Sequence, residues 1–291
     1  MSKPDRNRSE GTRQRIAAQQ EAARRAEQRR RMLIAGAGVA AVLVIVLIIV
    51  LTKVVGGNNN TNHNAGPAGG TALPAGVQSS IASVPASTFS TVGAGSVYSG
   101  ALTAANGPNL TSAGKPEMLY IGAEWCPYCA AERWAMAIAL SRFGTFSPLN
   151  GVHSSSSDVY PSTATLTFYK STYTSKYLVF TPIENQDTNK NTLQVPNSAQ
   201  QALWNKYDPS NGYPFIDIGN RFIAGSTYNP QVLQGLSWSQ IAGDLSNPSS
   251  PVSKGAVGSA NVFTAAICKM TNNQPSSVCT SSPISTLESH L

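Results

Sequence analysis

The 291-residue sequence has little charge, histidine or cysteine. Asp, Glu, Lys and Arg together make up 12% of it, and it holds three histidines and four cysteines. The histidines lie far apart, and neither His153 nor His290 stands in a recognisable motif. The sequence therefore offers no evident histidine partner for a hydrolase mechanism that uses a cysteine–histidine pair. The low charge fits an exported protein.

The positive charge is concentrated at the start of the chain. Residues 1–31 carry ten Lys/Arg and four Asp/Glu, whereas the remaining 260 residues carry eleven and ten. Because the rest of the chain has almost no excess of positive charge, we predict no nucleic-acid partner. The basic arm has two interpretations: an amphipathic helix on anionic lipid, or a solvated flank that only sets membrane topology.

Residues 32–51 contain no charged side chain. As a helix this run would be roughly 30 Å long, the thickness of the hydrocarbon core of a bilayer. A cleaved signal peptide has a shorter apolar core and a small-residue cleavage site, and no such site follows here; a lipobox cysteine is also absent. We predict a single transmembrane signal anchor over residues 32–55, in contact with the lipid bilayer. The arm 1–31 would lie in the cytoplasm and the remainder outside it.

Beyond the anchor, the composition predicts three further segments. Residues 56–77 are rich in Gly, Asn and Ala and show no periodicity, which is typical of a flexible linker. We expect one extracytoplasmic domain over residues 78–282 and a C-terminal tail over residues 283–291. All four cysteines lie on the outer side, where disulfide bonds persist.

Cys126 and Cys129 lie between an apolar run, Met118 to Gly122, and a predicted helix that ends at Phe143. Two thiols at this spacing can close a disulfide without moving the backbone. A sulfur at a helix start is favoured as thiolate by unpaired N–H groups and the helix dipole. We therefore predict Cys126 as the attacking thiol and Cys129 as the thiol that resolves the mixed disulfide. The same spacing also occurs in half of a zinc site.

The surrounding residues resemble known families. Ala123-Glu124-Trp125-Cys126 before a C-x-x-C helix resembles the active-site entry of thioredoxin-fold proteins. The internal Pro127-Tyr128 is similar to that of glutaredoxins and some periplasmic disulfide isomerases. The string from Leu119 to Trp134, with Arg142-Phe143-Gly144 after it, is similar more narrowly to the domain-of-unknown-function 929 family. This resemblance covers roughly residues 78 to 282.

The resemblance implies an α/β fold, a thioredoxin-like mixed sheet flanked by helices, here preceded by the predicted transmembrane helix. It implies that Pro214 is a cis-proline packed beside the two sulfurs, with Tyr213 held extended for pairing with a substrate. We assign Trp125, Pro127, Tyr128 and Tyr213 to substrate contact, and we predict no cofactor and no metal ion. Thioredoxins carry a buried acid in the strand before the motif, but no acid lies between Met118 and Ala123. Glu124 is the nearest candidate for a proton shuttle, although we expect it to be solvated; we expect Glu132 and Arg133 at the surface.

The second pair, Cys268 and Cys279, brackets a turn-rich loop after a predicted helix, Asn261 to Met270. We predict a structural disulfide, with a redox relay to the first pair as the alternative. The other expected elements are strands within Thr163–Lys170 and Lys176–Pro182, helices over Ser198–Tyr207 and Ser237–Leu245, a hairpin over Tyr213–Ile223, and a loop or short strand over Thr88–Gly100.

These features together predict a membrane-anchored extracytoplasmic thiol–disulfide oxidoreductase or isomerase. Its partners would be cysteine-containing exported proteins and a membrane redox partner. The alternative is a non-enzymatic zinc-binding, copper-binding or redox-sensing module that uses the same cysteines.

Overall fold

The computed structural model describes residues 67–291. The predicted arm 1–31, the predicted anchor 32–55 and the first half of the predicted linker 56–77 lie outside the described residues. Chain contacts separate residues 1–62 from residues 63–291, and the described residues belong to the second unit. Over residues 67–291, no helix combines the length and the apolar character that crossing a membrane requires.

A mixed sheet forms the centre of this unit. Its strands are β2 (Leu102–Ala104), β3 (Thr111–Ser112), β4 (Lys115–Ala123), β9 (Val179–Gln186), β10 (Phe215–Ile218) and β11 (Phe222–Ala224). They follow the order β2-β11-β10-β4-β3, and β9 also pairs with β4. β9 runs parallel to β4, whereas β10 is antiparallel to β4 and to β11. The predicted mixed α/β class is confirmed.

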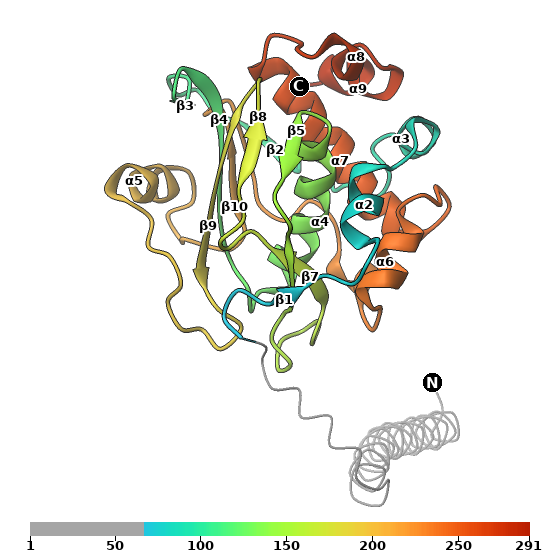
Figure 1. Cartoon of the computed structure of the whole chain (residues 1–291). Helices are drawn as coiled ribbons and strands as arrows, with labels where there is room; N and C mark the ends of the chain where they lie inside the picture. Colours follow the sequence, from blue (N-terminus) through green and yellow to red (C-terminus); the bar gives the residue numbers. More distant parts are fainter. Residues whose placement is uncertain (1–66) are drawn as a thin grey trace, which may run out of the picture. The chain divides into compact units, whose positions relative to one another are not determined.

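Helices cover both faces of the sheet (Figure 1). The helix α5 (Ser198–Tyr207) lies on one face, and α4 (Pro127–Ser141) and α7 (Pro251–Met270) lie on the other. Successive side chains of β4 point to opposite faces, so Leu119 packs in the cluster with Trp204 of α5. Tyr120 packs in the cluster with Trp134 of α4.

The helix α4 is buried on all sides. It packs against α7, β7 (Ala164–Thr167), α2 (Val77–Ala82) and the short helix η1 (Pro230–Leu233). Thirteen of its fifteen residues are buried. Because the helix has no exposed face, every charged side chain in its middle must find its partner inside the protein.

The remaining elements surround this core. They are β1 (Thr71–Ala72) and β6 (Asn150–His153), which join β7 in a three-stranded sheet, β5 (Gly144–Phe146) paired with β8 (Tyr173–Ser175), and the helices α3 (Ala86–Val92), α6 (Trp238–Asp244), α8 (Ser276–Cys279) and α9 (Ser282–Glu288).

Several element predictions are confirmed, one is wrong, and one predicted helix is too short at its start. The strand after Met118, the C-x-x-C helix, the hairpin and the helices α5 and α6 lie where expected. The segment expected to be a loop or short strand from Thr88 instead begins inside α3. The helix α7 begins at Pro251, ten residues before the expected Asn261. Its first half contains Gly258, where a Cβ would lie 2.5 Å from the Ala94 carbonyl oxygen, so close packing selects a poor helix former there.

The ordered unit also extends past both expected boundaries. Thr71 and Ala72, placed in the linker 56–77, pair with Gly151 and Asn150. In the expected tail 283–291, α9 packs against α7, and Ile284 is fully buried. In the expected tail, Leu287 and Leu291 also pack against the core cluster.

Candidate functional site

Cys126 and Cys129 lie at the N-terminus of α4. Cys126 is the N-cap residue, and its Sγ accepts a hydrogen bond from the backbone N–H of Cys129 at 3.3 Å. Pro127 occupies the first turn, where a missing N–H costs no helix hydrogen bond. Both cysteines are free thiols. The chain thus places two thiols face to face within the first helical turn.

The pKa values of the two thiols are shifted in opposite directions. The hydrogen bond with the Cys129 thiol lowers the pKa of Cys126, as do the Cys129 N–H and the charge of Arg133, against the effect of burial. Burial raises the pKa of Cys129 well above its usual value, and the neighbouring Cys126 raises it further. The side chain of Cys126 is 3% exposed and that of Cys129 0%. Cys126 is therefore both the easier thiolate and the sulfur nearer to solvent.

Aromatic side chains surround the sulfurs. Trp125, Tyr128 and Tyr213, all predicted substrate contacts, are half-buried and pack against the cysteine pair. Trp125 Nε1 donates a hydrogen bond to Gln186 Oε1 at 2.9 Å, and the rings of Trp125 and Tyr213 meet edge to face. Pro127, the fourth predicted contact, is buried in the helix turn. The structure thus gathers three partly accessible aromatic rings at the site.

Pro214 lies beside the pair, as the resemblance implied, and its peptide bond with Tyr213 is cis. The Cys126 thiol donates a weak hydrogen bond to the Tyr213 carbonyl oxygen at 3.8 Å. A cavity of about 450 Å³ adjoins Pro214. It is lined by residues of the β2 and β11 strands, by Tyr98 and Ser99, and by Tyr207 and Asp208.

The prediction that Arg133 lies at the surface is wrong. Its side chain is fully buried and forms a bidentate ion pair with Glu184 of β9: Nε to Oε1 at 2.8 Å and Nη2 to Oε2 at 2.7 Å. Glu184 Oε1 also accepts a hydrogen bond from the Phe168 backbone N–H at 3.1 Å. This pair brings a permanent positive charge close to both thiols, and that charge lowers the pKa of each.

Glu132 and Glu124 are also buried, against expectation. Glu132 is 0% exposed and accepts hydrogen bonds from Thr227 N at 2.6 Å and Thr227 Oγ1 at 2.9 Å. Burial raises its pKa to about 8. Glu124, expected in solvent, is 1% exposed and accepts a hydrogen bond from Thr167 Oγ1 at 2.7 Å. The sequence did hold a signal for the helix residues, because Glu132 and Arg133 interrupt an apolar run that circles all sides of α4.

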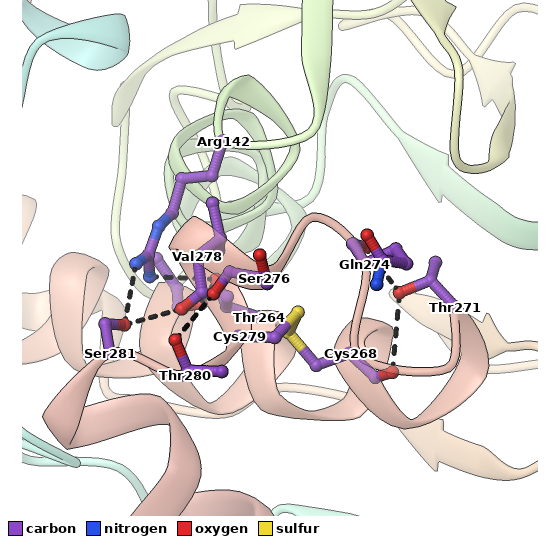
Figure 2. The surroundings of a disulfide bond; sticks show 11 residues. Arg142, Thr264, Cys268, Thr271, Gln274, Ser276, Val278, Cys279, Thr280 and Ser281 are labelled. Atoms are coloured by element: carbon purple, nitrogen blue, oxygen red, sulfur yellow. Dashed lines mark hydrogen bonds between the residues drawn. A yellow bond between two sulfur atoms is a disulfide. The ribbon is translucent and has the colours of Figure 1, made fainter.

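Cys268 and Cys279 form the predicted disulfide, with their Cα atoms 5.6 Å apart. Figure 2 shows Arg142, directly after α4, reaching this region, where its guanidinium contacts Thr264 Oγ1 at 3.4 Å and Ser281 Oγ at 3.5 Å. The disulfide therefore lies near the C-terminal end of α4. A helix of this length spans roughly 22 Å, which separates the disulfide from Cys126 and Cys129 at the other end.

The disulfide also bears on the zinc hypothesis. A zinc site built from all four cysteines conflicts with a bond that uses two of their sulfurs. Among residues 67–291, no group of three or more His, Cys, Asp or Glu side chains is arranged to hold a metal ion.

One family model matches the chain. It is described as Domain of unknown function (DUF929) and covers residues 102–269, more than half of the sequence. The matched region runs from β2 almost to the end of α7 and includes Cys126, Cys129 and Pro214. No curated protein and no solved structure matches the chain. The chain belongs to the DUF929 family.

Proposed function

We propose that this protein is a thiol–disulfide oxidoreductase or isomerase with a thioredoxin-like arrangement of its sheet and helices. One observation carries the proposal: the sulfur of Cys126 caps α4 and accepts the Cys129 N–H, while Cys129 is fully buried behind it. A dithiol with one activated, slightly exposed sulfur and one fully buried sulfur is suited to stepwise exchange. The thioredoxin-like arrangement is supported by the parallel pairing of β4 with β9 and by the antiparallel pairing of β4 with β10, the strand that follows Pro214.

The chemistry is a pair of sulfur displacements. The Cys126 thiolate attacks one sulfur of a substrate disulfide, forms a mixed disulfide and releases the other substrate sulfur as a thiolate. Cys129 then loses its proton and attacks Cys126, which closes the Cys126–Cys129 disulfide and releases the second substrate thiolate. Run in reverse, the oxidised pair transfers its disulfide to a reduced substrate dithiol. We favour oxidation or isomerisation, because no acid lies between Met118 and Ala123, the part of the strand where thioredoxins carry one.

The substrates are proposed to be exported proteins that contain cysteines. The half-buried rings of Trp125, Tyr128 and Tyr213 supply apolar contact area around Cys126. The cavity beside Pro214 offers space for a neighbouring part of the substrate chain. The proposal includes no nucleic-acid partner, because thiol–disulfide exchange needs only a polypeptide that contains cysteine.

We also propose that residues 32–55 anchor the protein in the cell membrane, with the domain outside and a membrane protein as its redox partner. The charge-free run and the basic arm before it support this topology. Protease added to intact cells should release a soluble fragment that begins in the Gly/Asn-rich segment after residue 55. Full protection of the domain would contradict the topology.

A trapping experiment tests the function. The substrate is a model protein that has been reduced and then reoxidised, so that it carries disulfide bonds. In the full-length chain, Cys129→Ser should accumulate a mixed disulfide with this substrate, because the resolving sulfur is gone. Cys126→Ser should form no such complex and should not exchange a model disulfide. The double variant Cys268→Ala with Cys279→Ala, which changes only the distal disulfide, is the matched control and should retain exchange. Stoichiometric metal that blocks both free thiols, without exchange, would support the metal-binding alternative instead.

A further inference from the structure

The hydroxyl of Tyr120 lies in a space that any side chain at position 122 would fill. Tyr120 is fully buried, and its hydroxyl makes no hydrogen bond with any residue of the 67–291 region. Its ring packs edge to face on Phe168. A Cβ atom at Gly122 would lie 2.0 Å from this hydroxyl, so only a glycine at that position of β4 admits it. Buried polar atoms without partners are rare in native proteins and call for a functional explanation.

A second donor without a partner lies in the same region. Arg133 uses Nε and Nη2 to bind Glu184, but its Nη1 is buried and has no acceptor within residues 67–291. Arg133 follows Cys129 by four residues on α4, so the two side chains lie on one face of the helix. Helical side chains lean toward the N-terminus, which directs the guanidinium toward the turn that holds Cys129.

Both donors are electrostatically coupled to the thiols. Burial raises the pKa of both Cys129 and Tyr120 well above their usual values, and the charge of Arg133 opposes this rise at both groups. A negative charge on Cys129 raises the pKa of Tyr120 further. The phenol thus responds to the charge of the buried sulfur. The hydroxyl lies over Gly122 on the face of the sheet that α4 covers, and a hydroxyl on that face can donate a hydrogen bond to a thiolate in the first turn of α4.

We propose that Tyr120 and Arg133 stabilise the Cys129 thiolate that resolves the mixed disulfide, so that this site works without the buried acid expected in a thioredoxin-like strand. This inference rests on the function proposed above. The carboxylate oxygens of Glu184 are already engaged, because Arg133 binds both of them and the Phe168 N–H binds one. The proton of Cys129 is then released to solvent.

The step is balanced as written. Cys129–SH loses H⁺, its sulfur attacks Cys126 of the mixed disulfide, the Cys126–substrate S–S bond breaks, and the substrate sulfur leaves as a thiolate. Within residues 67–291, the titratable and charged groups coupled to Cys129 are Cys126 and Arg133 of α4, Tyr120 of β4, and Tyr213 before β10. Glu184 of β9 is bound to Arg133. Arg133 is the permanent positive charge in that set.

A small aromatic disulfide whose released thiolate is coloured separates the two steps. The reduced full-length chain in mild detergent should release one thiolate when Cys126 attacks the reagent. It should release a second when Cys129 resolves the mixed disulfide. The test variant is Tyr120→Phe, which removes the hydroxyl and keeps the ring. The matched control is Tyr228→Phe, also fully buried and next to α4, whose hydroxyl donates to the Ala131 carbonyl oxygen at 2.9 Å.

For Tyr120→Phe we expect a normal first release and a second release slowed about tenfold near neutral pH. Its pH midpoint should rise by about one unit, which corresponds to about 1.4 kcal/mol of lost thiolate stabilisation. Tyr228→Phe should lower thermal stability and leave both releases unchanged. An unchanged second release in Tyr120→Phe, or equal slowing of both steps, would overturn the inference. If wild-type protein gives no first release that depends on Cys126, the proposed function itself fails.

Discussion

The guanidinium of Arg133 and the carboxylate of Glu184 bind each other at two points while neither side chain is exposed to solvent. Arg133 lies on α4, the helix that follows β4 in the chain. Glu184 lies on β9, the strand that pairs parallel with β4. This contact ties the C-x-x-C helix to the sheet directly below the thiols. The guanidinium charge also opposes the rise in pKa that burial causes at both sulfurs.

Breaking this pair on one side should be costly. Glu184→Gln leaves a buried guanidinium without its counter-charge, and we expect a loss of about 3–5 kcal/mol in the free energy of unfolding. Replacing both partners together, Arg133→Met with Glu184→Leu, should cost clearly less, because no charge is left unpaired. Urea unfolding of the three proteins measures this. A double variant as unstable as the single one would show that packing, rather than charge pairing, dominates.

Burial of Glu132 should make the free energy of unfolding depend on pH. Its pKa in the folded chain is raised to about 8, so the folded state holds a proton that the unfolded state has already released above about pH 4.5. Stability from this group is therefore fully present below about pH 4.5 and is lost as pH rises to about 8, by roughly 3–5 kcal/mol. Glu132→Gln stays uncharged, and its unfolding free energy should fall less over that range. Parallel pH curves for the two proteins would contradict the assignment.

The distal disulfide should support stability only. Replacing Cys268 and Cys279 together by Ala opens a short loop, and the loop-entropy model predicts a loss of about 3 kcal/mol. Exchange at Cys126 should persist, since the disulfide lies at the other end of α4. Thermal unfolding and a thiol-exchange assay on the same sample check both points. Full stability combined with lost exchange would favour the relay.

Short sequence patterns predicted the elements that depend only on neighbouring residues. The apolar run before Cys126, the Gly219–Asn220 turn between β10 and β11, and the short spacing of Cys268 and Cys279 each gave the observed element or bond. The position of Pro214 followed from the resemblance rather than from the sequence pattern alone. Element ends and weakly patterned helices were less predictable, as the glycine-containing first half of α7 illustrates.

The polar interior of the site could not be predicted in the same way. Arg133 and Glu184 are 51 residues apart, and nothing in the local sequence of either indicates the other. The space for the Tyr120 hydroxyl depends on Gly122, which by itself predicts only a weak position in a strand. Glu124 and Glu132 resemble ordinary surface acids until the packing around them is known.

The most direct test of the central claim is the pH dependence of alkylation of Cys126 and Cys129 in the reduced full-length chain, followed separately by mass spectrometry. The account predicts that Cys126 reacts first, with a midpoint below the ordinary thiol value of about 8.5, while Cys129 stays largely unmodified over the same range. A Cys126 midpoint at or above about 8.5, or faster modification of Cys129, would contradict the assignment of Cys126 as the attacking thiol.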